Sequence, residues 1–133
     1  MLESKALALD LGTRKTGVAI TDAKRSVVFL REPISHQNEA EQLQKIKVLL
    51  ETEQAQTLVL GLSLNWKGEE THQSKLSRNL EAKIREFFTG EIVWVDESYS
   101  SLQAEEHVQG DWSHSEAARI ILDTFLHQPF ERG

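Results

Sequence analysis

The sequence predicts an α/β fold in which a mixed five-stranded sheet carries helices on both faces. Three short apolar segments follow one another within the first 31 residues, with only turns between them. Two more apolar segments come later, each separated from its neighbours by a stretch whose apolar residues recur at helical spacing. Three strands in a meander followed by strand–helix units give the element order βββαβαβαα.

The first three strands form the predicted meander. Residues 5–11 (KALALDL) and 16–22 are the first two strands, with Gly12 in the turn between them. Residues 26–31 (SVVFLR) form the third strand, which we expect Pro33 to end.

A helix and a buried strand come next. The helix covers residues 38–51, where Asn38 can cap the first turn and Glu41 stands three residues on, as in a capping box. Residues 57–62 (TLVLGL) are a short, continuous apolar run, which is typical of a buried parallel strand. The helix turns one apolar face to the core, made of Leu43, Ile46, Leu49 and Leu50.

The remaining elements repeat this alternation. A second helix ends before Gly90, and residues 91–95 (EIVWV) form the fifth strand. A third helix is expected after Ser100, and the last helix opens at Ser113. The apolar stripes of the second and the last helix are Leu76, Leu80, Ile84, Phe87 and Phe88, and Ala118, Ile121, Leu122 and Phe125.

Composition narrows the class of protein. The 133 residues are enough for one domain, which we expect to span 1–133, and 39% hydrophobic with 27% charged residues is typical of a soluble globular chain. No apolar run is long enough to cross a bilayer and the N-terminus lacks a signal-peptide pattern, so we expect a cytoplasmic location. The absence of cysteine excludes disulfides and thiolate metal sites. A net charge of −6 argues against coating nucleic acid by bulk charge, but leaves room for a local basic patch.

Carboxylates stand where strands end. Asp10 lies among apolar residues, where a charge needs hydrogen bonds, a cation or a metal, although it could instead cap the following turn. Asp96 and Glu97 follow the fifth strand directly, and only one of two adjacent residues on an extended segment can face the site. Carboxylates brought together repel unless they share a cation such as Mg²⁺ or Mn²⁺. The alternative is that the 96–97 pair is a solvated turn.

Four blocks of sequence resemble one known family. They are D-x-G-T with a following G-V-A, GLSLN with Gly68 just after it, VDE at 95–97, and AARIIL at 117–122. In this order they resemble the bacterial YqgF-type family of Holliday junction resolvase-like proteins, also described as pre-16S rRNA nucleases, over about Ala6 to Leu126. The resemblance implies an RNase H-like fold and a Mg²⁺- or Mn²⁺-dependent endonuclease. Its substrate would be ribosomal RNA precursor or branched DNA, with the ribosome as a candidate partner.

The resemblance also assigns roles to residues. The catalytic, metal-binding set falls on Asp10, Glu97 and His114, with Asp96 and Thr13 in support. The residues expected to contact nucleic acid are Arg14, Lys15 and Lys67.

Two departures from the family pattern bear on activity. His114 stands where the family has a third carboxylate, and an imidazole suits Mn²⁺ better than Mg²⁺ or could orient water instead. Ser98 replaces an arginine and cannot neutralise a phosphate. The alternative functions are therefore an eroded domain that binds RNA, the ribosome or a protein, and a Holliday junction resolvase. The sequence is compatible with a monomer or a homodimer.

Overall fold

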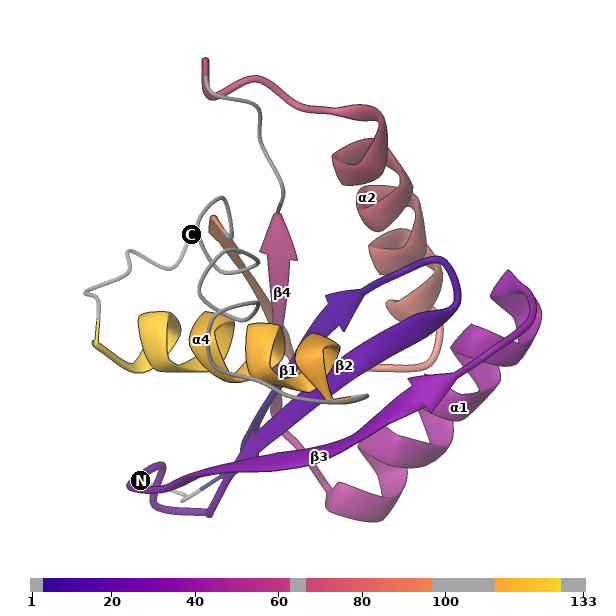
Figure 1. Cartoon of the computed structure of the whole chain (residues 1–133). Helices are drawn as coiled ribbons and strands as arrows, with labels where there is room; N and C mark the ends of the chain where they lie inside the picture. Colours follow the sequence, from indigo (N-terminus) through magenta and orange to yellow (C-terminus); the bar gives the residue numbers. More distant parts are fainter. Residues whose placement is uncertain (1–3, 63–66, 97–111, 128–133) are drawn as a thin grey trace.

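The computed structural model describes residues 4–62, 67–96 and 112–127. Five strands form one sheet, with α1 and α2 on one side and α4 crossing the other (Figure 1). The strands are β1 (Ala6–Leu11), β2 (Lys15–Thr21), β3 (Val28–Ser35), β4 (Thr57–Leu62) and β5 (Glu91–Asp96). The helices are α1 (Glu39–Glu53), α2 (His72–Ile84) and α4 (Ser113–His127). Among these described residues no helix is long and apolar enough to cross a membrane.

The strand order is β3-β2-β1-β4-β5. The first three strands pair antiparallel, while β1 pairs parallel with β4 and β4 with β5. This confirms the mixed five-stranded sheet with helices on both faces. The helix expected after Ser100 falls in 97–111, outside the described residues.

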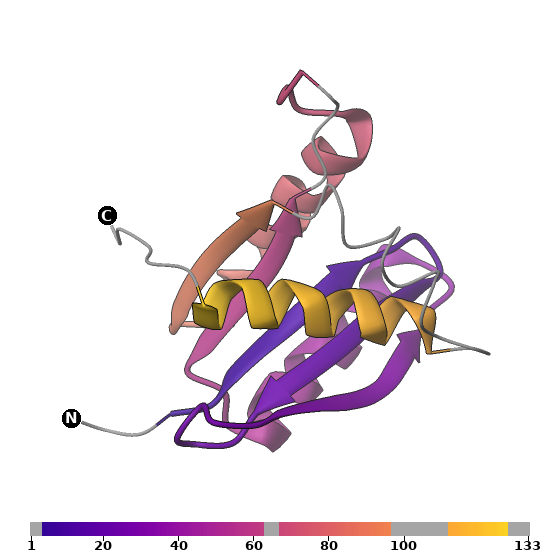
Figure 2. The same cartoon turned by 60° about the vertical axis from the view of Figure 1, so that its left-hand side comes forward.

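The two faces of the sheet carry side chains of different size. Towards α1 and α2 the strands present large aliphatic residues, including Leu7, Leu9, Ile20, Leu58 and Leu60. Towards α4 they present mostly small ones, including Ala6, Ala8, Ala19, Val59 and Val95. Figure 2 shows α4 lying across this second face from end to end. Small side chains let a helix approach a sheet closely, which matters for the site described below.

The helix starts follow their capping residues. Asn38 precedes α1, and its side-chain oxygen accepts a hydrogen bond from the Glu41 backbone N–H at 2.8 Å, as expected. Thr71 caps α2 in a reciprocal capping box with Ser74. The last helix begins at Ser113, the predicted residue.

Some predicted boundaries are wrong. The second helix does not run up to Gly90 but ends at Ile84, and the third strand begins at Val28. The third strand does not stop before Pro33 but continues to Ser35. The pairing of β2 with β3 shifts register between Thr16 and Val18, opposite this proline. Because β3 is an edge strand, a proline that lacks the backbone N–H is tolerated at such an irregularity. The strand therefore continues past Pro33.

Candidate functional site

Asp10 and His114 meet where β1 ends and α4 begins. Asp10 follows Ala6 and Ala8 on the face that α4 covers, and its side chain is 19% exposed. The Nδ1 atom of His114 lies 3.4 Å from Oδ2 of Asp10. Two residues 104 positions apart in the sequence therefore form one polar pair where β1 ends.

The pair changes the acidity of the imidazole. Its hydrogen bond to Asp10 raises the pKa of His114, and partial burial opposes this shift. The nearby positive charge of Lys15 also lowers that pKa, but less than the carboxylate raises it. The ring and the carboxylate thus stabilise each other when no other cation lies between them.

A glycine allows the helix to come this close. Gly17 on β2 is the register partner of Asp10. A Cβ atom at Gly17 would overlap the backbone carbonyl of His114 and lie 2.7 Å from the backbone nitrogen of Ser115. The start of α4 therefore rests directly on the β2 backbone, which sets the height of His114 above the sheet.

A buried serine fixes the same turn of α4. The Ser115 hydroxyl accepts a hydrogen bond from the Val18 backbone N–H at 3.1 Å and donates one to the Arg31 carbonyl at 2.5 Å. These two backbone groups belong to β2 and β3, where their register shifts. Ser115 thus hydrogen-bonds to backbone groups beside the register shift between β2 and β3. These bonds hold the start of α4, one residue after His114.

Positive charges border the pair. Arg14 and Lys15 lie at the turn from β1 to β2; Arg14 is exposed and Lys15 half-buried. The guanidinium of Arg14 donates a hydrogen bond to Oε1 of Gln37 at 3.3 Å. Lys15 is near enough to His114 to affect its pKa. Two of the three cations predicted to contact nucleic acid therefore lie in the turn that follows Asp10, and Lys15 lies close to His114.

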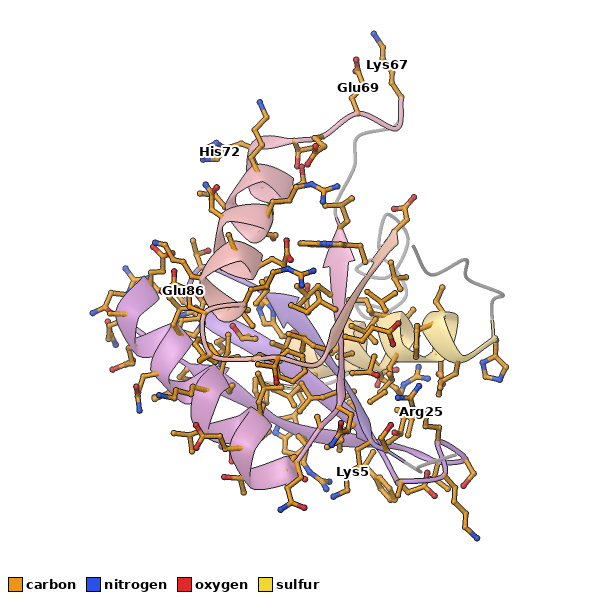
Figure 3. The ribbon with its side chains drawn as sticks, turned by 180° about the vertical axis from the view of Figure 1, so that it is seen from behind. Lys5, Arg25, Lys67, Glu69, His72 and Glu86 are labelled. Atoms are coloured by element: carbon orange, nitrogen blue, oxygen red, sulfur yellow. The ribbon has the colours of Figure 1, made fainter. Side chains whose placement is uncertain are left out.

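Other predicted residues lie apart or outside the described ranges. Asp96 is exposed and, two positions after Trp94, lies on the α1/α2 face, opposite Asp10. Thr13 is exposed and lines a cavity on that same face. Lys67 extends into solvent beyond the first turn of α2, as Figure 3 shows. Glu97 and Ser98 fall outside the described residues.

A family model described as "RuvX: Holliday junction resolvase" matches residues 4–128. The chain belongs to the RuvX family. A relative from Maridesulfovibrio salexigens, named "Putative pre-16S rRNA nuclease", is 30% identical over 92% of this chain and 97% of its own. A second of the same name, from Oleidesulfovibrio alaskensis, is 32% identical over 96% of this chain and 95% of its own.

Solved structures place this RuvX chain in the RNase H-like fold. Thermus thermophilus RuvC in complex with a Holliday junction superposes with a TM-score of 0.64 at 9% identity, over 90% of each chain. A second T. thermophilus RuvC structure gives a TM-score of 0.51 at 11% identity, over 92% of this chain and 94% of that one. The expected family and fold are both confirmed.

The described side chains of this RuvX chain supply part of a divalent-metal site. The described residues contain no group of three or more His, Cys, Asp or Glu side chains that could hold an ion. Asp10 and His114 supply two donors, an oxygen and a nitrogen, on one face and in contact with each other. A mixed oxygen–nitrogen pair fits Mn²⁺, and a further carboxylate is needed to complete a site.

Sequence reasoning did not identify Gly17 and Ser115 as residues of the site. A signal was present for the glycine. Ala6, Ala8, Gly17 and Ala19 alternate with large residues along the first two strands. This alternation indicates a face that takes a closely packed helix. The role of Ser115 has no local signal, since its two partners lie about 90 residues away.

Proposed function

We propose that this chain is a divalent-metal-dependent endonuclease that hydrolyses phosphodiester bonds in structured RNA, first of all in ribosomal RNA precursor. The observation that carries the proposal is the Asp10–His114 pair at 3.4 Å, beside two cations, in a member of the RuvX family. The names of the relatives support the choice of substrate. We further propose that the whole chain, 1–133, acts as one cytoplasmic domain.

The proposed metal ligands are Asp10, His114 and Glu97. The choice of Glu97 rests on the described part of β5, since Glu97 itself lies outside it. Val93 and Val95 face α4 and Asp10, whereas Trp94 faces the other way. Strand alternation assigns the next odd-numbered position to the Asp10 face, so Glu97 is a better ligand candidate than Asp96.

Each residue of the site has a distinct role. When bound, a divalent ion would lower the pKa of a water molecule and balance the charge on the leaving oxygen. Asp10 contributes a carboxylate oxygen and holds the His114 ring in place through their contact. Arg14 and Lys15 attract the phosphate backbone to this edge of an otherwise acidic protein.

The ligand types favour Mn²⁺ over Mg²⁺. Mg²⁺ prefers oxygen ligands in octahedral geometry, while an imidazole suits transition metals. His114 removes one negative charge from the site that a carboxylate would supply. We therefore expect cleavage to be faster in Mn²⁺ than in Mg²⁺.

The decisive experiment compares the parent chain with Asp10→Asn on a ribosomal RNA precursor fragment, in Mn²⁺, Mg²⁺ and a chelator. Loss of a charged ligand removes several kcal/mol of charge stabilisation, so cutting should fall by at least about a hundredfold. Glu51→Gln is the matched control, because this exposed carboxylate lies on the α1 side of the molecule. Equal cutting by the parent chain and Asp10→Asn would refute the nuclease proposal.

Branched DNA is the second candidate substrate. It is favoured by the family's description as Holliday junction resolvases. A four-way junction and the RNA fragment should be offered in the same assay, and the faster Asp10-dependent reaction identifies the substrate. Binding of either without cleavage in any metal would instead support an eroded site that acts as a binding module.

A further inference from the structure

The turn that follows Asp10 is held from the opposite face of the sheet by a buried amide. Gln42 lies on α1 and is 5% exposed. Its side-chain nitrogen donates hydrogen bonds to the Gly12 carbonyl at 3.2 Å and to Oγ1 of Thr16 at 2.9 Å. These acceptors lie at the two ends of the turn, so one side chain spans its base and both donor hydrogens are used.

A histidine extends this network. The Nε2 atom of His36 lies 3.0 Å from Oγ1 of Thr16, and the His36 backbone N–H donates to the Arg14 carbonyl at 3.0 Å. His36 is 3% exposed, and its Nδ1 atom is buried without a hydrogen-bond partner. A buried nitrogen without a partner costs free energy. The other hydrogen bonds of Gln42 and His36 described here all reach the 12–16 turn.

A cavity borders the turn on the α1/α2 side. It has a volume of about 250 Å³ and lies between α1 and α2, lined by Gly12, Gln42 and Gln73 together with apolar residues such as Leu11 and Leu80. Gln73, on α2, reaches the turn from this side and donates to the Leu11 carbonyl at 3.2 Å. Hydrogen bonds from two helices therefore support two consecutive carbonyls directly after Asp10, beside this cavity.

We propose that Gln42 is a positioning residue, which fixes the 12–16 turn and through it the placement of Asp10, Arg14 and Lys15 relative to one another. Gln73 is the secondary tether. As far as the reaction is concerned, this inference rests on the proposed function. Asp10 is two residues from the tethered Gly12, so release of that carbonyl lets the end of β1 and the two cations shift. Displacements of about 1 Å are enough to reduce catalysis strongly.

The test is Gln42→Glu, which keeps the shape of the side chain but removes its donors and turns a negative charge towards the Gly12 carbonyl. The rate constant kcat per folded molecule should fall by about tenfold or more. Backbone amides of residues 12–16 should exchange faster with deuterium, while those in the middle of α1 stay protected. Ile46→Val is the matched control, because Ile46 is buried one turn further along α1 and its truncation removes packing only.

Lower pH provides a rescue that a merely structural role would not show. A buried glutamic acid has a raised pKa, and its protonated form can again donate to the Gly12 carbonyl. The kcat ratio of Gln42→Glu to the parent chain should therefore rise as pH falls from about 8 to about 6, whereas the Ile46→Val ratio stays flat. If Gln42→Glu does not fold, Gln73→Glu on the exposed surface of α2 should lower kcat and speed exchange in the turn by a smaller amount. It should show no rescue at lower pH, because an exposed glutamate stays ionised at about pH 6.

The outcomes separate this inference from the proposed function. An unchanged kcat with unchanged exchange in the turn, or a loss that Ile46→Val reproduces, overturns the positioning role. If the parent chain shows no Asp10-dependent cutting, the nuclease proposal fails by itself. Exchange in the 12–16 turn then decides: faster exchange in Gln42→Glu upholds the tether, and unchanged exchange removes it.

Discussion

The two faces of the sheet are built differently at the end where Asp10 lies. On the α1/α2 face, large aliphatic side chains fill the layer between sheet and helices, and a hydrogen-bonded network with a cavity takes over only beneath the turn. On the α4 face the sheet offers alanines and a glycine, and the helix start lies against backbone. A histidine approaches the 12–16 turn on each face. His36 contacts Thr16 on the α1/α2 face, and His114 lies near Gly12 on the α4 face.

This difference means that one face mainly determines the stability of the fold, while the other mainly determines the position of His114 relative to Asp10. Burial of large side chains supplies most of the hydrophobic free energy, in rough proportion to the area removed from water. Contact between the backbones of α4 and β2 buries little apolar area. It does, however, fix the distance between the start of α4 and the sheet. We therefore expect changes in the aliphatic core of the α1/α2 face to lower stability, and changes where the start of α4 meets β2 to displace the site.

The largest expected effect is that of Gly17→Ala. The added methyl group overlaps the His114 carbonyl, so the start of α4 must move away from β2 and take His114 from Asp10. Asp10-dependent cleavage should fall by about a hundredfold or more. Imidazole NMR signals of His114 should also shift, which reports the lost contact independently of activity.

Ala19→Val is the control for that change. Ala19 lies two residues along the same strand and the same face, under the middle of α4. The extra volume there should lower stability by about 1–3 kcal/mol through overpacking and leave the Asp10–His114 contact in place. Equal loss of activity in both variants would contradict the special role of Gly17.

The second effect is a loss of stability on the other face. Leu60→Ala removes a fully buried side chain of the α1/α2 core and should lower the free energy of unfolding by about 2–5 kcal/mol. Urea denaturation measures this loss. Cleavage per folded molecule, assayed well below the melting temperature, should stay close to that of the parent chain. A selective loss of cleavage would show that the two faces are not separable.

The smallest effect is the pH dependence of stability in a chelator. Burial holds the pKa of His36 below its ordinary 6.5, so its contribution is present above pH 6.5 and is lost as pH falls through the lowered value. The contact with Asp10 raises the pKa of His114 above 6.5, so its contribution is full below pH 6.5 and is lost as pH rises through the raised value. His36→Gln should flatten the acidic limb and Asp10→Asn the alkaline limb of stability measured by urea denaturation.

Local patterns explain why so much of the fold was predictable. The fourth strand is an uninterrupted apolar run, and its observed bounds, Thr57–Leu62, are those predicted. Asn38 marks the start of α1 because capping depends on residues close in sequence. Pro33 misled because its effect depends on whether a strand is central or at an edge, which neighbouring residues do not reveal.

The site was predictable only in part. The sequence motifs pointed to Asp10 and His114, and the structure brings these two side chains together. Their catalytic roles stay a prediction. The roles of Gly17 and Gln42 depend on which segment approaches from far along the chain, and no short pattern encodes that approach. The placement of Glu97 stays a prediction.

The irregular third strand has a consequence for how the molecule meets copies of itself. An outer strand with free hydrogen-bonding groups is a template for accretion of further chains. Here Pro33 removes one donor from the rim, and the charged Arg31 and Glu32 precede it. We therefore expect this edge of the sheet to pair poorly with a strand from another chain.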